Sequence, residues 1–237
     1  MKSSDKVVVA WCDPGMVDGY FAADMMKLGG ARRERIELTI RAEGGGLLSR
    51  TRNQVVATFL DRTESNWLWM VDTDHRVPVE VFDLLVAAAH EKSHPVVAGL
   101  YFGTWPHDRQ DWPYPQPVPV AYTLADDGTT FNPITDIEPR GLHKVDGAGT
   151  GCLMVHRSVL QAMRDEVDGP LKQWCWFQDG PIGDGRWLSE DLTFCARLGR
   201  RGVPIHVHTG AVLPHHKQHW ESDETWQAWR KDDGQQR

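Results

Sequence analysis

The feature that most constrains this chain is the alternation of short apolar runs with longer amphipathic segments in its first hundred residues. The apolar runs are bounded by turn residues and several are rich in Val, which is typical of buried strands. The segment 47–66 places Leu48, Val55 and Phe59 at helical spacing. Strands that alternate with helices in this way predict βαβ units and an α/β fold with a mainly parallel sheet. The predicted strands here are 6–12, 35–40, 67–71 and 95–102.

The length and composition fit one globular domain, which we expect to span residues 1–220 and to be followed by a polar tail over 221–237. Hydrophobic residues make up 41% and charged residues 25%, so the chain can bury a sizeable core without disulfides. The net charge of −7 argues against a protein that coats nucleic acid, because such proteins are normally basic. The four cysteines are too widely spaced for a zinc knuckle or a redox motif. No segment is typical of a signal peptide or membrane span, so we expect a soluble, cytoplasmic protein with no membrane contact and no obligate protein partner.

Polar residues follow the predicted strands at the points where those strands end. Asp13 follows the first strand, Arg41 follows the second, and Asp72 and Asp74 follow the third. In open α/β sheets, ligands bind beyond the carboxyl ends of the strands. Clustered carboxylates can hold a divalent cation there, although Asp is also common in ordinary turns.

The pattern changes after residue 102. The segment 103–134 is dense in Pro, Trp and Asp, and it predicts either a long loop or an irregular hairpin that turns at the DDG sequence. A Gly-rich turn, a short strand over 152–156 and a helix follow. A further helix is expected after Ser189, its predicted N-cap, and it should stop at Gly202 before a final strand.

Four motifs, in this order and spacing, resemble the GT-A glycosyltransferases, and within them the inverting, family-2-like group. The motifs are LLSRTRNQVV (47–56), WLWMVDTDH (67–75), VDGAGTGCLMVHRSV (145–159) and LSEDLTFCARLGRRGVPI (188–205). The resemblance covers roughly residues 6–217, and compact chains with this pattern are familiar from tailed phages. It implies a GT-A fold, with a Rossmann-like mixed sheet flanked by helices, and glycosyl transfer from a nucleotide-sugar, such as a UDP-sugar, to a hydroxyl.

The resemblance also implies how the donor is bound. Asp72 would contact the ribose, Asp74 would bind Mn²⁺ or Mg²⁺, and Asp13 would read the base or ribose. Such hard cations prefer oxygen ligands and bridge a diphosphate. Arg52 would support the nucleotide or diphosphate, the alternative being a place on a solvated helix face. The whole donor-binding set is Asp13, Pro14, Arg41, Arg52, Asp72, Thr73 and Asp74.

The pair Glu190-Asp191 at the start of the last helix is the predicted catalytic pair. In the family the Asp of such a pair is the usual general base, which here is Asp191. A positioned carboxylate can take the proton of the attacking hydroxyl. The alternative is that both residues only interact with the helix dipole. A non-catalytic nucleotide-sugar-binding module would have lost this base, whereas Asp191 is present.

The segment 206–220 contains five histidines. In many GT-A enzymes a His after the last strand completes the metal shell, and His215 or His216 matches that position best, with His208 as a further candidate ligand. Lys217 would face the diphosphate. A zinc hydrolase is the rival interpretation, because an H-x-H pair, His206 and His208, with His215 and a nearby Asp can bind Zn²⁺.

The acceptor side is expected at the Gly-rich turn Gly149, Thr150 and Gly151. Trp174 and Trp176 would add a platform for a stacked sugar or base, or would simply pack in the core. The phage-like pattern suggests a hydroxymethylated pyrimidine in DNA as acceptor, with a virion protein hydroxyl as the alternative. The cluster Arg197, Arg200 and Arg201 would favour DNA, and the acidic net charge opposes it.

Overall fold

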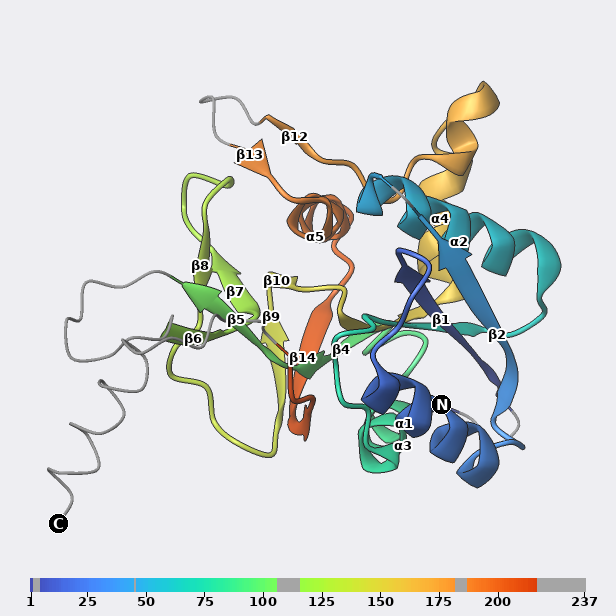
Figure 1. Cartoon of the computed structure of the whole chain (residues 1–237). Helices are drawn as coiled ribbons and strands as arrows, with labels where there is room; N and C mark the ends of the chain where they lie inside the picture. Colours follow the sequence, from blue (N-terminus) through green and yellow to red (C-terminus); the bar gives the residue numbers. More distant parts are fainter. Residues whose placement is uncertain (2–4, 45, 106–115, 182–186, 217–237) are drawn as a thin grey trace, which may run out of the picture.

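A computed structural model describes residues 1, 5–44, 46–105, 116–181 and 187–216. Its centre is a seven-stranded sheet in which β1, β2, β3, β4 and β14 run in one direction and β9 and β11 run in the other (Figure 1). In spatial order the strands are β2 (Ile36–Glu43), β1 (Val7–Asp13), β3 (Trp67–Val71), β11 (Cys152–His156), β4 (Val96–Leu100), β14 (Ile205–Val212) and β9 (Leu142–Val145).

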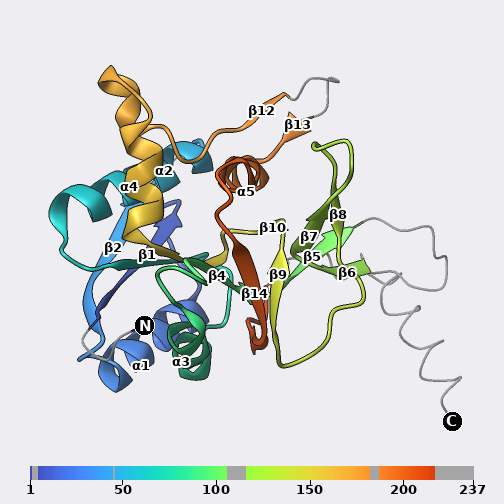
Figure 2. The ribbon, with the colours of Figure 1, turned by 180° about the vertical axis from the view of Figure 1, so that it is seen from behind.

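Helices cover both faces of this sheet, as Figures 1 and 2 show from opposite sides. Side chains of Val7 and Val9 pack on the face covered by α1 (Gly19–Ala31) and α3 (Val79–Ala88). Their neighbours Val8 and Ala10 pack on the other face. That face is covered by α2 (Leu48–Arg62), α4 (Arg157–Asp165) and α5 (Glu190–Arg200). Because successive strand residues point to opposite faces, a sheet buried on both sides needs the continuous apolar runs seen in the sequence.

Strand β11 lies between β3 and β4 and runs antiparallel to both. Cys152 at its start is paired with Val71 at the end of β3, and the Asp72 N–H donates to the Gly151 carbonyl at 2.9 Å. The antiparallel direction therefore brings the Gly-rich turn to the carboxyl end of β3, beside the aspartates.

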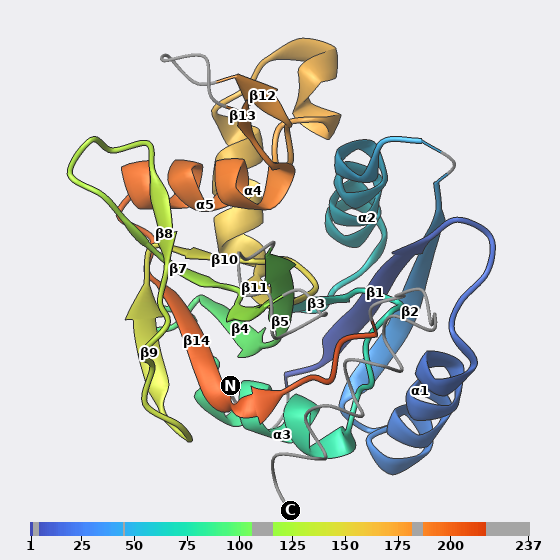
Figure 3. The same ribbon diagram turned by 60° about the vertical axis from the view of Figure 1, so that its left-hand side comes forward.

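The segment after β4 forms hairpins on the β9 side of the sheet in Figure 1, and Figure 3 shows β7 and β8 beside β9. Strands β5 (Phe102–Trp105) and β6 (Gln116–Pro119) pair, as do β7 (Ala121–Leu124) and β8 (Phe131–Pro133), and β10 (Gly147–Ala148) extends the second hairpin. The predicted DDG turn is confirmed, with Gly128 at φ +68°. A 3₁₀ turn over Gly169–Gln173 and the short pair β12 (Gly180–Pro181) and β13 (Trp187–Leu188) lead into α5.

The predicted α/β fold class, with helices on both faces of a mainly parallel sheet, is confirmed. Among the helices of the described residues, none is long and apolar enough to cross a membrane. The expected tail over 221–237 lies outside the described residues.

Candidate functional site

Several of the predicted site residues converge at the carboxyl ends of β1, β2 and β3. Asp13 ends β1 and is buried, and its carboxylate accepts two hydrogen bonds from Arg41 of β2, at 2.7 and 2.8 Å. The Gly15 N–H donates to the same carboxylate at 2.8 Å. Bonds from Arg41 are the main cause that lowers the pKa of Asp13, and burial opposes them. Pro14 follows on the surface, and Asp13 is thus held as a rigid anion at this edge.

Arg52 of α2 joins the end of β3 to the start of α5. Its side chain is only 5% exposed, so its alternative place on a solvated helix face is wrong. The guanidinium donates to both carboxylate oxygens of Asp72, at 3.0 and 3.1 Å, and also to Glu190. Burial by itself would lower the pKa of Arg52, but the two carboxylates outweigh it and raise that pKa. The cation therefore compensates two acidic groups of the site.

The predicted catalytic pair occupies the first turn of α5. Burial raises the pKa of Glu190, and the Arg52 guanidinium counteracts part of that rise. Asp191 is half-buried, and its Oδ1 accepts from the Leu192 N–H at 2.8 Å and from the Ser189 hydroxyl. Ser189 is the N-cap residue, as predicted, although its hydroxyl serves Asp191 and no backbone N–H. Glu190 is thus engaged in an ion pair with Arg52, whereas the Asp191 carboxylate is oriented by hydrogen bonds from Ser189 and Leu192.

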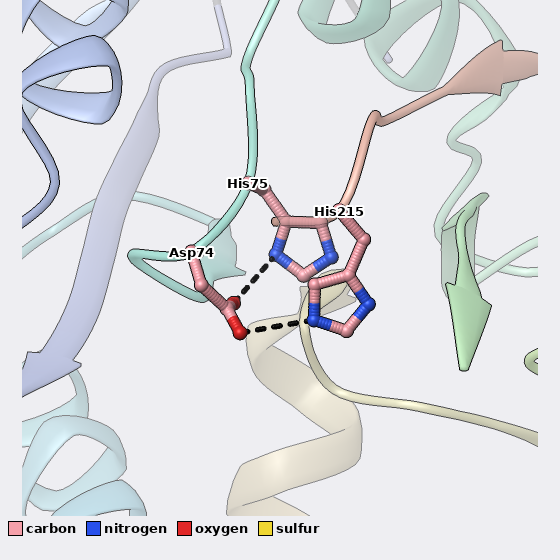
Figure 4. Close-up of side chains that lie close together, drawn as sticks. All are labelled: Asp74, His75 and His215. Atoms are coloured by element: carbon pink, nitrogen blue, oxygen red, sulfur yellow. Dashed lines mark hydrogen bonds and ion pairs between the residues drawn. The ribbon is translucent and has the colours of Figure 1, made fainter. Parts of the chain in front are cut away.

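The segments 74–76 and 214–216 run side by side at Asp74, as Figure 4 shows. The His216 N–H donates to the Asp74 carbonyl at 2.7 Å and the Arg76 N–H donates to the Pro214 carbonyl at 2.9 Å. This short antiparallel bridge places His75 opposite His215. The two imidazole rings are stacked, with centroids 4.3 Å apart and planes 15° apart.

The Asp74–His215 pair suits a divalent cation. His215 Nδ1 lies 2.7 Å from the Phe102 carbonyl oxygen, which can only accept, so Nδ1 carries a proton. His215 Nε2 lies 2.9 Å from Asp74 Oδ2. A carboxylate and the lone pair of a neutral imidazole facing each other need a cation or a second proton between them.

A third side chain stands at the same place. Asp74, His75 and His215 each offer a ligand atom, and these atoms all lie within 4.8 Å of one another. Both ring nitrogens of His75 are buried and make no hydrogen bond to the described residues, although Nδ1 lies 3.3 Å from Asp74 Oδ1. A buried polar group without a hydrogen bond costs about 1–3 kcal/mol. Three candidate ligands, one of them a buried ring that makes no hydrogen bond, therefore fit a bound metal ion. Sequence reasoning assigned no role to His75, although its position next to Asp74 was the available signal.

The other histidines of the C-terminal segment do not join this cluster. His208 Nδ1 accepts from the Gly210 N–H at 3.1 Å, and His206 packs its ring on His94 with centroids 4.6 Å apart. The His206, His208 and His215 set expected for a zinc hydrolase is not assembled in the described part of the chain. His216 Nδ1 lies 3.3 Å from Asp18 Oδ2. Lys217 and His219 lie outside the described residues.

The Gly-rich turn packs closely against Asp72 and its surroundings, and Thr73 continues the chain as a half-buried residue. A Cβ at Gly149 would fall 1.8 Å from the Tyr101 hydroxyl, and one at Gly151 would fall 3.0 Å from Asp72 Oδ2. The Thr150 hydroxyl is buried with no hydrogen-bond partner among the residues described. The turn is therefore a tightly packed wall of the site.

Trp174 and Trp176 were expected either to form an aromatic platform or to pack in the core. Trp176 is fully buried, and its Nε1 donates to the Leu160 carbonyl at 2.8 Å, so packing in the core is confirmed for this residue and stacking on an acceptor is wrong. Trp174 is half-buried, with the Arg50 guanidinium 5.9 Å from its ring centroid.

The arginines expected to favour DNA mostly have internal partners. Arg201 pairs with Glu166 through both terminal carboxylate oxygens. The half-buried Arg197 donates to the Trp176 carbonyl at 3.4 Å. These contacts hold the end of α5 against the neighbouring loop and helix, and they leave Arg200 as the exposed member of the group.

Comparison with known proteins supports the fold. No family model and no curated protein matches this chain. It is similar to the structure of A197 from STIV, with a TM-score of 0.51 and 16% identity over 90% of this chain and 86% of that one. It is also similar to GalNAc-T7, solved with UDP, GalNAc and Mn²⁺, with a TM-score of 0.53 and 9% identity over 92% of this chain but only 45% of that one. Similarity at these identities shows a GT-A-like fold and no more.

Proposed function

We propose that this protein is a metal-dependent glycosyltransferase that moves a sugar from a nucleotide-sugar, a UDP-sugar, to a hydroxyl acceptor. The observation that carries the proposal is the Asp74–His215 pair, because His215 is oriented by the Phe102 carbonyl so that its Nε2 faces the carboxylate. This pair stands next to Asp72 at the carboxyl end of β3, where α/β folds of this kind bind ligands. GalNAc-T7, which shares the fold, was solved with UDP and Mn²⁺.

The donor would lie over the ends of β1, β2 and β3. Asp13, held by Arg41, would accept hydrogen bonds from the base or ribose, with Pro14 beside it. Asp72 would accept a hydrogen bond from the ribose, and Arg52 would keep the Asp72 carboxylate in a fixed orientation. Arg52 is fully engaged with two carboxylates, so its contribution to the donor is indirect. It fixes Asp72 and neutralises charge that would otherwise repel a diphosphate.

The residues that would hold Mn²⁺ or Mg²⁺ are Asp74 and His215. A bound cation of this kind supplies Lewis-acid assistance to departure of the diphosphate. The Phe102 carbonyl fixes the ring of His215, and the bridge between the 74–76 and 214–216 segments fixes the distance to Asp74. Such prior positioning avoids reorganisation of the site when the donor binds.

Asp191 would act as the general base in a single displacement. The acceptor oxygen forms a bond to the anomeric carbon, the bond from that carbon to the diphosphate oxygen breaks, and the hydroxyl proton moves to Asp191. Attack from the face opposite the leaving group inverts the anomeric configuration. Glu190 would keep the helix start in place through Arg52.

The acceptor carries a free hydroxyl, either on a hydroxymethylated pyrimidine of DNA or on a virion protein. Stacking by Trp174 and Trp176 and a basic cluster at the end of α5 would favour the DNA acceptor. Trp176 is buried, and Arg197 and Arg201 have internal partners.

Binding and hydrolysis of candidate donors test this proposal without knowledge of the acceptor. We expect UDP to bind by calorimetry with Mn²⁺ present, and slow release of UDP from one member of a nucleotide-sugar panel. Asp72→Asn should weaken UDP binding, whereas Asp126→Asn, an exposed change in the β7–β8 turn, should not. If no nucleotide binds with either Mn²⁺ or Mg²⁺, the proposed function is wrong.

A further inference from the structure

The buried imidazole of His75 has no role in the proposed donor or acceptor contacts. It is 2% exposed, yet neither ring nitrogen has a hydrogen-bond partner among the described residues. Buried polar groups ordinarily make hydrogen bonds, so a buried ring that makes none and lies beside two candidate ligands indicates that it binds something.

The surroundings fix the direction of this ring. One face stacks on His215, and the Tyr101 ring meets it edge-on at 4.7 Å. A Cβ at Gly151 would fall 3.0 Å from His75 Cε1, so the Gly-rich turn also packs closely against the ring. His75 Nδ1 lies 3.3 Å from Asp74 Oδ1, within ion-pair distance but without hydrogen-bond geometry (Figure 4).

The Asp74 carboxylate is thus approached by two imidazole nitrogens, one at each oxygen. His215 Nε2 lies 2.9 Å from Oδ2 and His75 Nδ1 lies 3.3 Å from Oδ1. The three candidate ligand atoms fall within 4.8 Å of one another, close enough to share one ion. Figure 4 shows both rings turned with a nitrogen toward the same carboxylate.

We propose that His75 is a direct ligand of the bound cation, which makes the centre a two-histidine, one-carboxylate site. This inference rests on the metal-dependent part of the proposed function and goes beyond it by adding a ligand and a metal preference. Imidazole suits first-row transition metals, whereas Mg²⁺ prefers oxygen ligands and retains its water. The site therefore selects Mn²⁺ and Co²⁺ over Mg²⁺, with Co²⁺ held more tightly than Mn²⁺ in line with the Irving–Williams order.

The test counts histidine nitrogens on Mn²⁺ bound to the full chain, by pulsed electron paramagnetic resonance. We expect couplings from two histidines in the wild type and from one in His75→Phe, which keeps a flat ring but has no nitrogen. Calorimetry should show that His75→Phe loses at least about tenfold in Mn²⁺ affinity. Loss of Mg²⁺ affinity should be smaller, because imidazole contributes less to it.

His206→Phe is the matched control, because that histidine also has a buried, unpartnered ring nitrogen but packs outside the cluster. It should keep both couplings and wild-type Mn²⁺ affinity. Coupling from a single histidine in the wild type would overturn the proposal, whether or not His75→Phe folds. Unchanged Mn²⁺ affinity in a folded His75→Phe would also overturn it, and the proposed function would stand. Absence of any bound cation would overturn both.

Discussion

Arg52 of α2 donates to both carboxylate oxygens of Asp72, which follows β3 and lies 20 positions further along the sequence. The same guanidinium reaches Glu190, so one buried cation ties the end of β3 and the start of α5 to helix α2. A buried charge that loses its partner is strongly destabilising. Arg52 therefore contributes both to the stability of the fold and to the positions of Asp72 and Glu190.

Replacing Arg52 with Met should lower the free energy of unfolding by about 3 kcal/mol, because Glu190 would be left buried without its cation. Asp72 is partly exposed, which keeps the loss at the lower end of the range for buried pairs. Urea denaturation measures this directly. Arg62→Met, an exposed change in the last turn of the same helix, should stay within about 0.5 kcal/mol of wild type. Equal losses in the two variants would contradict the ion-pair role.

The pair of Asp13 and Arg41 predicts how stability depends on pH. The folded pKa of Asp13 lies below its ordinary value, so its contribution is present above about pH 4, the unfolded value, and is lost as the pH falls through the folded pKa. The stability difference between wild type and Arg41→Met should therefore be largest at neutral pH and shrink in acid. Urea titrations between pH 7 and pH 3 measure it, with the exposed Arg33→Met as control. A difference that grows in acid would show that the sign is wrong.

Local pattern predicted most elements of the fold, but it could not give strand direction. The run at Cys152–His156 is uniformly buried, and an apolar run reads the same in either direction, so its antiparallel place between β3 and β4 depends on the rest of the sheet. The end of helix α3 also depends on a contact outside the helix. The helix stops at Ala88 because His90 and His94 exchange backbone hydrogen bonds and close a turn.

Substitution of Gly149 by Ala tests the close packing behind the metal cluster. The added Cβ would fall 1.8 Å from the hydroxyl of the buried Tyr101, whose ring supports His75. Overpacking of this kind should cost about 1–3 kcal/mol of stability. Gly29→Ala, in helix α1 with nothing within 4 Å of the new Cβ, should instead stabilise by up to about 1 kcal/mol. Thermal unfolding of both variants decides the point, and a neutral Gly149→Ala would refute the packing argument.

Removal of the Asp74 charge tests the metal centre itself. Asp74→Asn keeps the size of the side chain but removes the anionic ligand, so Mn²⁺ affinity should fall at least about tenfold, and any transfer activity should fall with it. Calorimetry with Mn²⁺ alone provides the measurement, and Asp126→Asn serves as an exposed control. Transfer at the wild-type rate in excess chelator would show that the chemistry does not need the cation.

The sequence could predict the part of the candidate site that lies at the carboxyl ends of neighbouring parallel strands. The carboxyl ends of neighbouring parallel strands meet at one edge, so Asp13 and Asp72 could be placed together from the sequence. His75 acquires its surroundings from the bridge to His215, which is 140 residues away, and no local pattern encodes that contact. The two possible places of Trp176 could not be told apart from the sequence for the same reason, since its indole N–H donates to the Leu160 carbonyl of α4.

Asp191 and Glu190 stand next to each other, yet they should respond differently to loss of charge. Asp191→Asn keeps the shape of the proposed base but cannot take a proton, so the turnover rate should drop about 10²–10⁴-fold while nucleotide binding survives. Glu190→Gln breaks the buried pair with Arg52, so stability should fall as well, and activity should recover in part at lower temperature. Stopped assays of sugar transfer, calorimetry of UDP binding and urea unfolding separate these effects. Proton NMR of the product should also show an inverted anomeric configuration. Near-normal turnover in Asp191→Asn, or a product with retained configuration, would assign the chemistry to another residue.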